Sequence, residues 1–302
     1  MKTLPAGVRV RSQVVDSGNG EPLGVACVDP FPDPGRAFVV AMGFGACLDA
    51  FELQRFGVIA QVLQARLLVV ETPGYSYTPT RLRGRERRAL LRADFGPVAA
   101  RMLTAALAVD RTDRGERQVG VLGYSLGASV AAAMAGVANQ QVEKQVALDS
   151  IVLVEPVANR HWSGPQLLSA MRTENKLIDG YLKTNDDVPG ALTPRGRIQG
   201  APLPRQHYLD LLLLSNALRA GRLVEELRAA TAGHPGLTVV VAHGASSHLS
   251  QMDACRSMVR QCGEAGIDVK DVVVPGHHGL WQSLPAVKSL ADSLATALGH
   301  LS

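Results

Sequence analysis

The sequence predicts an α/β protein with a mostly parallel central sheet of about eight strands and helices on both faces. Short, continuous apolar runs alternate with helical segments over most of the 302 residues. Such runs are typical of strands that are buried on both faces of a parallel sheet. In addition, 46% of the residues are hydrophobic and only 4% are aromatic, so aliphatic side chains can fill the large core expected at this length.

The first third of the chain is predicted to open with a hairpin. Residues 8–15 alternate between apolar and polar, turn residues follow, and residues 23–28 are apolar again, which is typical of two paired strands. Buried strands are expected over 37–42 and 67–70, because each is an apolar run that is followed by a turn signal. One helix is expected over 85–109.

The rest of the chain is predicted to alternate strand and helix around one insertion. Strands are expected over 119–122, 151–154, 237–241 and 269–274, and helices over 128–138, 252–265 and 284–298. Residues 157–235 interrupt this order with several prolines and one long helical run over 206–228. We therefore expect a core of residues 1–156 and 236–302, with 157–235 as an inserted helical cap.

One serine lies where a strand is predicted to turn into a helix. Ser125 stands between Gly123 and Gly127 in the stretch VGVLGYSLGA. Glycines allow a sharp turn that exposes the hydroxyl, and the N-terminus of the following helix presents N–H groups with partial positive charge. A tight turn without chemistry could use the same residues, but the strand-to-helix context favours a nucleophile.

A nucleophilic serine requires a base within hydrogen-bond reach, usually histidine. His277 and His278 follow the last predicted strand. The carboxyl ends of parallel strands share one edge of a sheet, so both histidines are expected at the edge that carries Ser125.

With these elements in place, the chain resembles the α/β-hydrolase superfamily of serine esterases, lipases and thioesterases over nearly its whole length apart from the cap. The resemblance rests on residues 123–127 as nucleophile elbow, 43–45 after the third strand, 71–75 after the fourth, and the late histidine loop. It implies that Ser125 is the nucleophile and that the backbone N–H groups of Phe44 and Leu126 form the oxyanion hole.

The resemblance also implies that His278 is the general base. In this family the histidine typically stands about seven residues before a proline that opens the last helix, and that proline is here Pro285. His277 is the alternative.

The acid of the expected triad is the least determined residue. The family usually carries an aspartate after the seventh strand, but residues 241–250 contain no carboxylate, and Ser247 occupies the expected position. Glu155, at the end of the sixth strand, is one candidate, although it could merely pair at a strand end. Asp253 is the alternate, although its spacing from Ser250 suggests helix capping. Two alternatives to a triad remain: a Ser–His dyad that has no acid, and a protein that has lost hydrolytic activity.

Neither a metal nor a cofactor is expected. The four cysteines form no Cys-x-x-Cys pair, and His161, His243 and His248 have no carboxylate or cysteine at ligand spacing. The chain has no leader-like apolar segment and no run of about 18 apolar residues. A cytoplasmic location is expected, and no membrane span.

An arginine-rich stretch from Arg81 to Arg92 accompanies a net charge of +4. A solvated face is its simplest interpretation, and docking of an acidic carrier or anionic group is the alternative. No aromatic residues are interleaved with the arginines, so nucleic-acid binding is not expected.

Taken together, the resemblance and the apolar cap predict a hydrolase of a hydrophobic or acyl carboxylic ester or thioester that acts through an acyl-enzyme. An acyltransferase is one alternative, because only the acceptor would differ. A non-catalytic binding protein of the same fold is the other. No oligomeric state is predicted.

Overall fold

Eight strands form one mixed sheet in the part of the chain that the structure, a computed structural model, describes: residues 5, 7–16, 21–30, 35–110, 119–138, 147–184, 204–234 and 236–299. Across the sheet the strands are β1 (Arg9–Asp16), β2 (Pro22–Asp29), β4 (Arg66–Val70), β3 (Ala37–Ala41), β6 (Val119–Tyr124), β7 (Leu148–Val154), β9 (Thr238–Gly244) and β10 (Val269–Val274). Of these, β2 runs antiparallel to both neighbours, and the other pairs are parallel. The predicted mostly parallel sheet is therefore confirmed.

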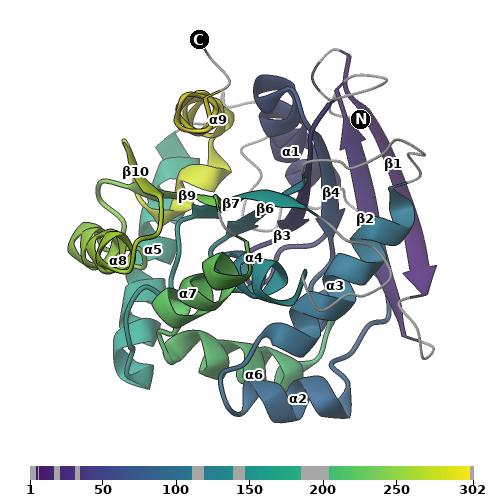
Figure 1. Ribbon diagram of the computed structural model, residues 1–302, viewed down its shortest axis with the longest axis horizontal. Helices are drawn as coiled ribbons and strands as arrows, with labels where there is room; N and C mark the ends of the chain where they lie inside the picture. Colours follow the sequence, from purple (N-terminus) through teal and green to yellow (C-terminus); the bar gives the residue numbers. More distant parts are fainter. Residues whose placement is uncertain are drawn as a thin grey trace.

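Helices cover both faces of the sheet (Figure 1). One layer contains α1 (Ala50–Leu63) and α9 (Leu284–Ala297), and the other contains α3 (Gly96–Val109), α4 (Leu126–Ala138), α7 (Leu223–Gly233) and α8 (Met252–Glu264). Strand side chains alternate between the two layers: Phe38 and Val40 lie in the cluster with α1 and α9, and Val39 and Ala41 lie in the other. Strand β3 is apolar at every position because both of its faces are buried.

Two helices predicted as continuous are divided in the structure. The expected helix over 85–109 is α2 (Gly84–Leu90) followed by α3. Ala93 adopts a left-handed conformation with φ 56° after α2, and Pro97 stands in the first turn of α3, as expected at a helix end and a helix start. The run over 206–228 is likewise α6 (Tyr208–Arg219) followed by α7. They are separated near Gly221, whose φ is 67°.

Residues 157–235 also contain a long helix that the sequence analysis did not predict, α5 (Gly164–Thr184). Its proline, Pro165, lies in the first turn, where proline is compatible with a helix. Pro189, Pro194 and Pro202 of the expected cap lie outside the described residues.

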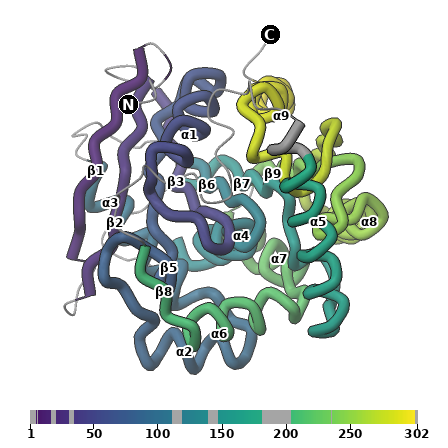
Figure 2. Tube along the Cα trace, turned by 180° about the vertical axis from the view of Figure 1, so that it is seen from behind, coloured from purple at the N-terminus to yellow at the C-terminus, as the bar shows by residue number. Residues whose placement is uncertain are grey.

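The expected cap segment contacts the rest of the protein in two ways. A short ladder between β5 (Tyr75–Ser76) and β8 (Arg205–Gln206) leads into α6 at one end of the molecule (Figure 2). By contrast, α7 packs against α4 and α8 in a layer that covers the sheet. The division into core and cap stays a prediction. Among the described helices, none is long and apolar enough to cross a membrane.

Candidate active site

Three turns at one edge of the sheet bring Ser125, Glu155 and His278 together. Ser125 directly follows β6, Glu155 directly follows β7, and His278 opens the 3₁₀ turn η1 (His278–Gln282) after β10. These strands are parallel, so their carboxyl ends meet at the same edge. All three side chains are buried.

Hydrogen bonds connect the three side chains in series. His278 Nε2 lies 3.0 Å from Ser125 Oγ, and His278 Nδ1 lies 2.9 Å from Glu155 Oε2. With Nδ1 protonated towards the carboxylate, Nε2 can accept the serine proton. The geometry is that of a nucleophile, a base and a group that orients the base.

The backbone is strained at two of these residues. Ser125 has φ 57° and Glu155 has φ 51°, and they are two of the four described non-glycine residues with positive φ. Such conformations are costly and persist where the surroundings enforce them. Here the Ser125 N–H donates to Val154 O at 2.9 Å, and the Glu155 N–H donates to Ala242 O at 2.7 Å. Each residue is therefore held by the neighbouring strand.

The turn that carries Ser125 is closed by two glycines in tight contact. A Cβ on Gly123 would lie 2.0 Å from Gly127 O, and a Cβ on Gly127 would lie 2.0 Å from Ala41 O. Both distances are far below a real contact, and the obstructing atoms are backbone. Glycine is thus required for α4 to begin this close to the end of β3.

Gly127→Ala is expected to destabilise the protein by about 3 kcal/mol or more, because the new methyl group overlaps the carbonyl of Ala41 and forces a backbone shift. Urea unfolding measures this effect. Gly136→Ala in the same helix is the matched control: a Cβ there meets nothing within 4 Å, so stability should stay level or rise by about 0.5–1 kcal/mol. Equal stability of the two variants would contradict the close packing of the turn.

The loop after β9 lacks the expected aspartate but donates to Glu155 instead. Ser247 Oγ donates to Glu155 Oε2 at 2.7 Å, and the Gly244 N–H donates to Glu155 Oε1. Ser247 Oγ in turn accepts from the Ser250 N–H at 2.9 Å. Asp253, the alternate acid, lies in the first turn of α8. Both oxygens of the Glu155 carboxylate therefore accept hydrogen bonds from this loop or lie against His278.

His277 has a partner of its own in α5. Its Nδ1 lies 2.9 Å from Glu174 Oε2, and Glu174 Oε1 accepts from the His248 N–H. Burial alone would raise the pKa of Glu174, but the hydrogen bonds from His277 and His248 outweigh it and lower that pKa. His277 thus ties α5 to the histidine loop, and the contact with Ser125 belongs to His278.

Aromatic stacking fixes the histidine loop against the serine turn. The Tyr124 ring stacks with those of His278 and Trp281, with centroids 5.5 and 4.6 Å away. Its hydroxyl donates to the His278 carbonyl at 2.6 Å. Since Tyr124 immediately precedes Ser125, one side chain holds the histidine loop in register with Ser125.

Helix α1 holds this loop from the other side. Arg55 donates to the carbonyls of Trp281 and Gln282, and Glu52 accepts from Trp281 Nε1 at 2.7 Å. Burial raises the pKa of Glu52 to about 7, although the Trp281 hydrogen bond and Arg55 act in the opposite direction. Asp49, which caps α1, also raises this pKa.

This raised pKa makes stability depend on pH. Between about pH 4.5 and 7 the folded protein keeps the Glu52 proton and the unfolded chain loses it, so stability falls as pH rises through this window. Glu52→Gln, which cannot ionise, is expected to gain up to roughly 3 kcal/mol relative to wild type between about pH 5 and pH 8. Urea unfolding at the two pH values measures the change. The exposed control Glu225→Gln should show no such gain, and a pH-independent difference for Glu52→Gln would refute the assignment.

The expected oxyanion donors lie beside Ser125. Leu126 is the first residue of α4, whose initial N–H groups have no partner within the helix. Phe44 follows Gly43, where a Cβ would lie 3.5 Å from Ser125 Cβ. An oxyanion hole made by these two N–H groups stays a prediction.

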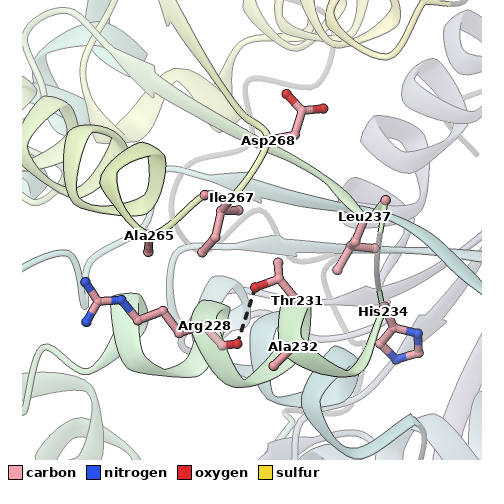
Figure 3. Close-up of a pocket in the computed structure, with 10 residues that line it drawn as sticks. Arg228, Thr231, Ala232, His234, Leu237, Ala265, Ile267 and Asp268 are labelled. Carbon is pink, nitrogen blue, oxygen red and sulfur yellow. Dashed lines mark hydrogen bonds between the residues drawn. The ribbon is translucent and has the colours of Figure 1, made fainter.

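A separate pocket of about 580 Å³ (Figure 3) lies at the amino-terminal ends of β9 and β10. Leu237 and Asp268, which line it, immediately precede β9 and β10, whereas the triad follows strand ends. Arg228 and Thr231 of α7 also line it. This pocket is therefore distinct from the Ser125 site. Across the described part of the chain, no three His, Cys, Asp or Glu side chains gather as metal ligands would.

Comparisons with known proteins identify the fold. No protein-family model and no curated protein sequence matches the chain, but solved structures do. A lipase in its open form matches with a TM-score of 0.60 and 14% identity, covering 97% of this chain and 99% of its own. A Pyrobaculum calidifontis esterase matches with a TM-score of 0.57 and 16% identity, over 99% and 86%. A thioesterase domain from the curacin biosynthetic pathway matches at 0.56 and 14%, over 95% and 99%. The protein has the α/β-hydrolase fold.

Several residues around this site carry no signal in the sequence: Ser247 stands only where the family has an aspartate, and Glu174, Glu52 and Trp281 belong to no motif. A carboxylate or indole within an amphipathic helix or turn carries no local signal of this kind. Tyr124 had one available signal, since an aromatic residue immediately before a nucleophile must pack near it.

Proposed function

We propose that the protein is a serine hydrolase of carboxylic esters or thioesters, with Ser125 as nucleophile, His278 as general base and Glu155 as the acid. The observation that carries this proposal is the continuous hydrogen-bonded series from Glu155 through His278 to Ser125. The match of the whole chain to an esterase, a lipase and a thioesterase domain supports it at the level of the fold.

The proposed reaction follows from this series. His278 Nε2 removes the Ser125 Oγ proton as the oxygen attacks the substrate carbonyl, and the N–H groups of Phe44 and Leu126 stabilise the resulting oxyanion. The imidazolium then protonates the leaving alcohol or thiol, which leaves an acyl-serine. A water molecule, deprotonated by His278 Nε2, then attacks the acyl-serine and releases the carboxylic acid. Glu155 holds the imidazole in the required tautomer and stabilises its positive charge.

A hydrophobic acyl group is the proposed substrate feature. Leu167 of α5 and Leu213 and Leu214 of α6 are buried in the apolar cluster, and Met171 packs against it. Helices with this composition, placed over the carboxyl edge of the sheet, would exclude water from an acyl-enzyme and favour apolar chains.

Turnover of a series of p-nitrophenyl esters and acyl thioesters of increasing chain length tests the proposal. We expect hydrolysis, with kcat/KM rising as the acyl chain lengthens from acetyl. Product partition with added alcohols or amines distinguishes the acyltransferase alternative, since that enzyme would form the transfer product in preference to the free acid. Binding without any turnover would instead indicate a non-catalytic protein and overturn the proposal.

A further inference from the structure

Helices α2 and α6 pack side by side at one end of the molecule, which both views show (Figures 1 and 2). Asp210 joins them: its carboxylate pairs with Arg87 at 3.0 Å and accepts from the Leu82 N–H at 3.0 Å. Because α2 and α6 bury the sides that face the core, their remaining sides are turned to solvent.

One part of this surface is cationic. Arg85 and Arg88 are exposed on α2 three residues apart, a spacing that places them on one side of the helix, and Arg92 is exposed in the turn that follows it. The exposed Arg222 extends the group, because its guanidinium donates to the Arg92 carbonyl at 3.1 Å. In the described part of the chain, Arg85, Arg88 and Arg92 form no ion pair, whereas Arg222 interacts electrostatically with Glu226. Asp94, the nearest exposed acid in sequence, instead accepts from the Gly96 N–H.

The other part of the surface is apolar. Leu91 is 64% exposed, Tyr208 75%, Leu209 57% and Leu212 67%. Single exposed apolar residues are common on proteins, but several large ones gathered on adjoining helices mark an interaction site. We call the four arginines and these four residues together the arginine–leucine surface.

We propose that the arginine–leucine surface binds the face of an anionic lipid bilayer. Peripheral membrane-binding helices combine leucines and aromatic residues that enter the interface with arginines that contact lipid phosphates. The exposed arginines complement a negative headgroup layer, and the neighbouring leucines can enter its acyl boundary.

The form of the surface favours a lipid layer over an acidic protein. Each of its leucines and its tyrosine is more than half exposed to solvent. A protein partner would need a surface shaped to receive each of these side chains. A fluid interface requires no such match.

The surface also adjoins the edge of the sheet that carries the triad. α6 begins just after β8, which pairs with β5 beyond the carboxyl end of β4, and the His207 N–H donates to Gly74 O at 2.9 Å. The N-terminal end of α6 therefore lies near the strand ends that carry this edge of the sheet. Lipid binding itself does not depend on the proposed function.

Co-sedimentation of the full chain with vesicles tests the proposal. Vesicles of phosphatidylcholine mixed with phosphatidylglycerol should bind the protein, and vesicles of phosphatidylcholine alone should bind it far more weakly, with salt reducing the binding. Arg85→Glu/Arg88→Glu should weaken the partition coefficient at least about tenfold, because each cation near an anionic surface contributes to binding. Leu209→Ser/Leu212→Ser should weaken it by about tenfold through lost apolar burial.

Arg256→Glu/Arg260→Glu is the matched control, since both arginines are exposed on α8 and the change of charge is identical. It should bind nearly as wild type does. Thermal melts establish that every variant is folded. The proposal fails if folded wild type does not bind anionic vesicles, or if the α8 control loses as much binding as the α2 variant. It also fails if the surface binds polyglutamate but not vesicles, because the partner would then be an acidic protein.

Discussion

Ser125→Ala is expected to lower kcat for ester hydrolysis by roughly 10⁴- to 10⁶-fold, because it removes the hydroxyl on which the proposed acyl-enzyme forms. The substitution keeps the Cβ and removes only an oxygen, so the backbone at φ 57° meets no new contact. Turnover of a soluble p-nitrophenyl ester and the thermal melt together measure the effect: activity should vanish while the melting temperature changes little.

Ser129→Ala is the control for this result. Ser129 is buried in α4, the helix that follows Ser125, and its hydroxyl has no hydrogen-bond partner among the described residues, so its loss should leave turnover intact. The double variant Ser125→Ala/His278→Ala should be about as inactive as either single variant, because the two side chains act as one unit. Substantial activity in Ser125→Ala would mean that another residue is the nucleophile.

Glu155→Gln is expected to reduce kcat by about 10³- to 10⁴-fold at neutral pH. Glutamine can keep a hydrogen bond to His278 Nδ1, but it carries no charge to stabilise the imidazolium. It can also present its NH₂ group to the ring and select the wrong tautomer. The kcat of the purified variant, compared with wild type over a range of pH, measures this loss.

Asp253→Asn distinguishes between the two candidate acids. This residue lies in the first turn of α8, whereas His278 Nδ1 bonds to Glu155, so its neutralisation should leave turnover nearly unchanged. Full activity in Glu155→Gln combined with inactivity in Asp253→Asn would reverse the assignment of the acid.

The strands of the sheet could be predicted because each of them has a recognisable pattern within its own few residues. Runs such as 37–42 and 119–122 are apolar at every position, and burial on both faces of a parallel sheet requires this. Helix ends were less predictable. The breaks near Ala93 and Gly221 depend on left-handed backbone conformations, and the left-handed residue after α2 is an alanine, which carries no sequence signal of a turn.

The candidate site was only partly predictable, for a physical reason. Ser125 and His278 belong to local patterns, a glycine-flanked turn and a loop after a strand. The choice of Glu155 over Asp253 depends on which carboxylate reaches an imidazole 123 residues away, and no local pattern encodes that distance. Glu174 depends on how α5 packs against the histidine loop, which is likewise a tertiary contact.

The central claim is that Ser125 is an activated nucleophile, and labelling with a fluorophosphonate probe tests it most directly. Peptide mapping by mass spectrometry should find one covalent adduct in the wild-type protein, on Ser125. Ser125→Ala should carry none, and His278→Ala should react far more slowly because the base is missing. A folded wild-type protein that takes up no probe, or that takes it up at another residue, would contradict the account.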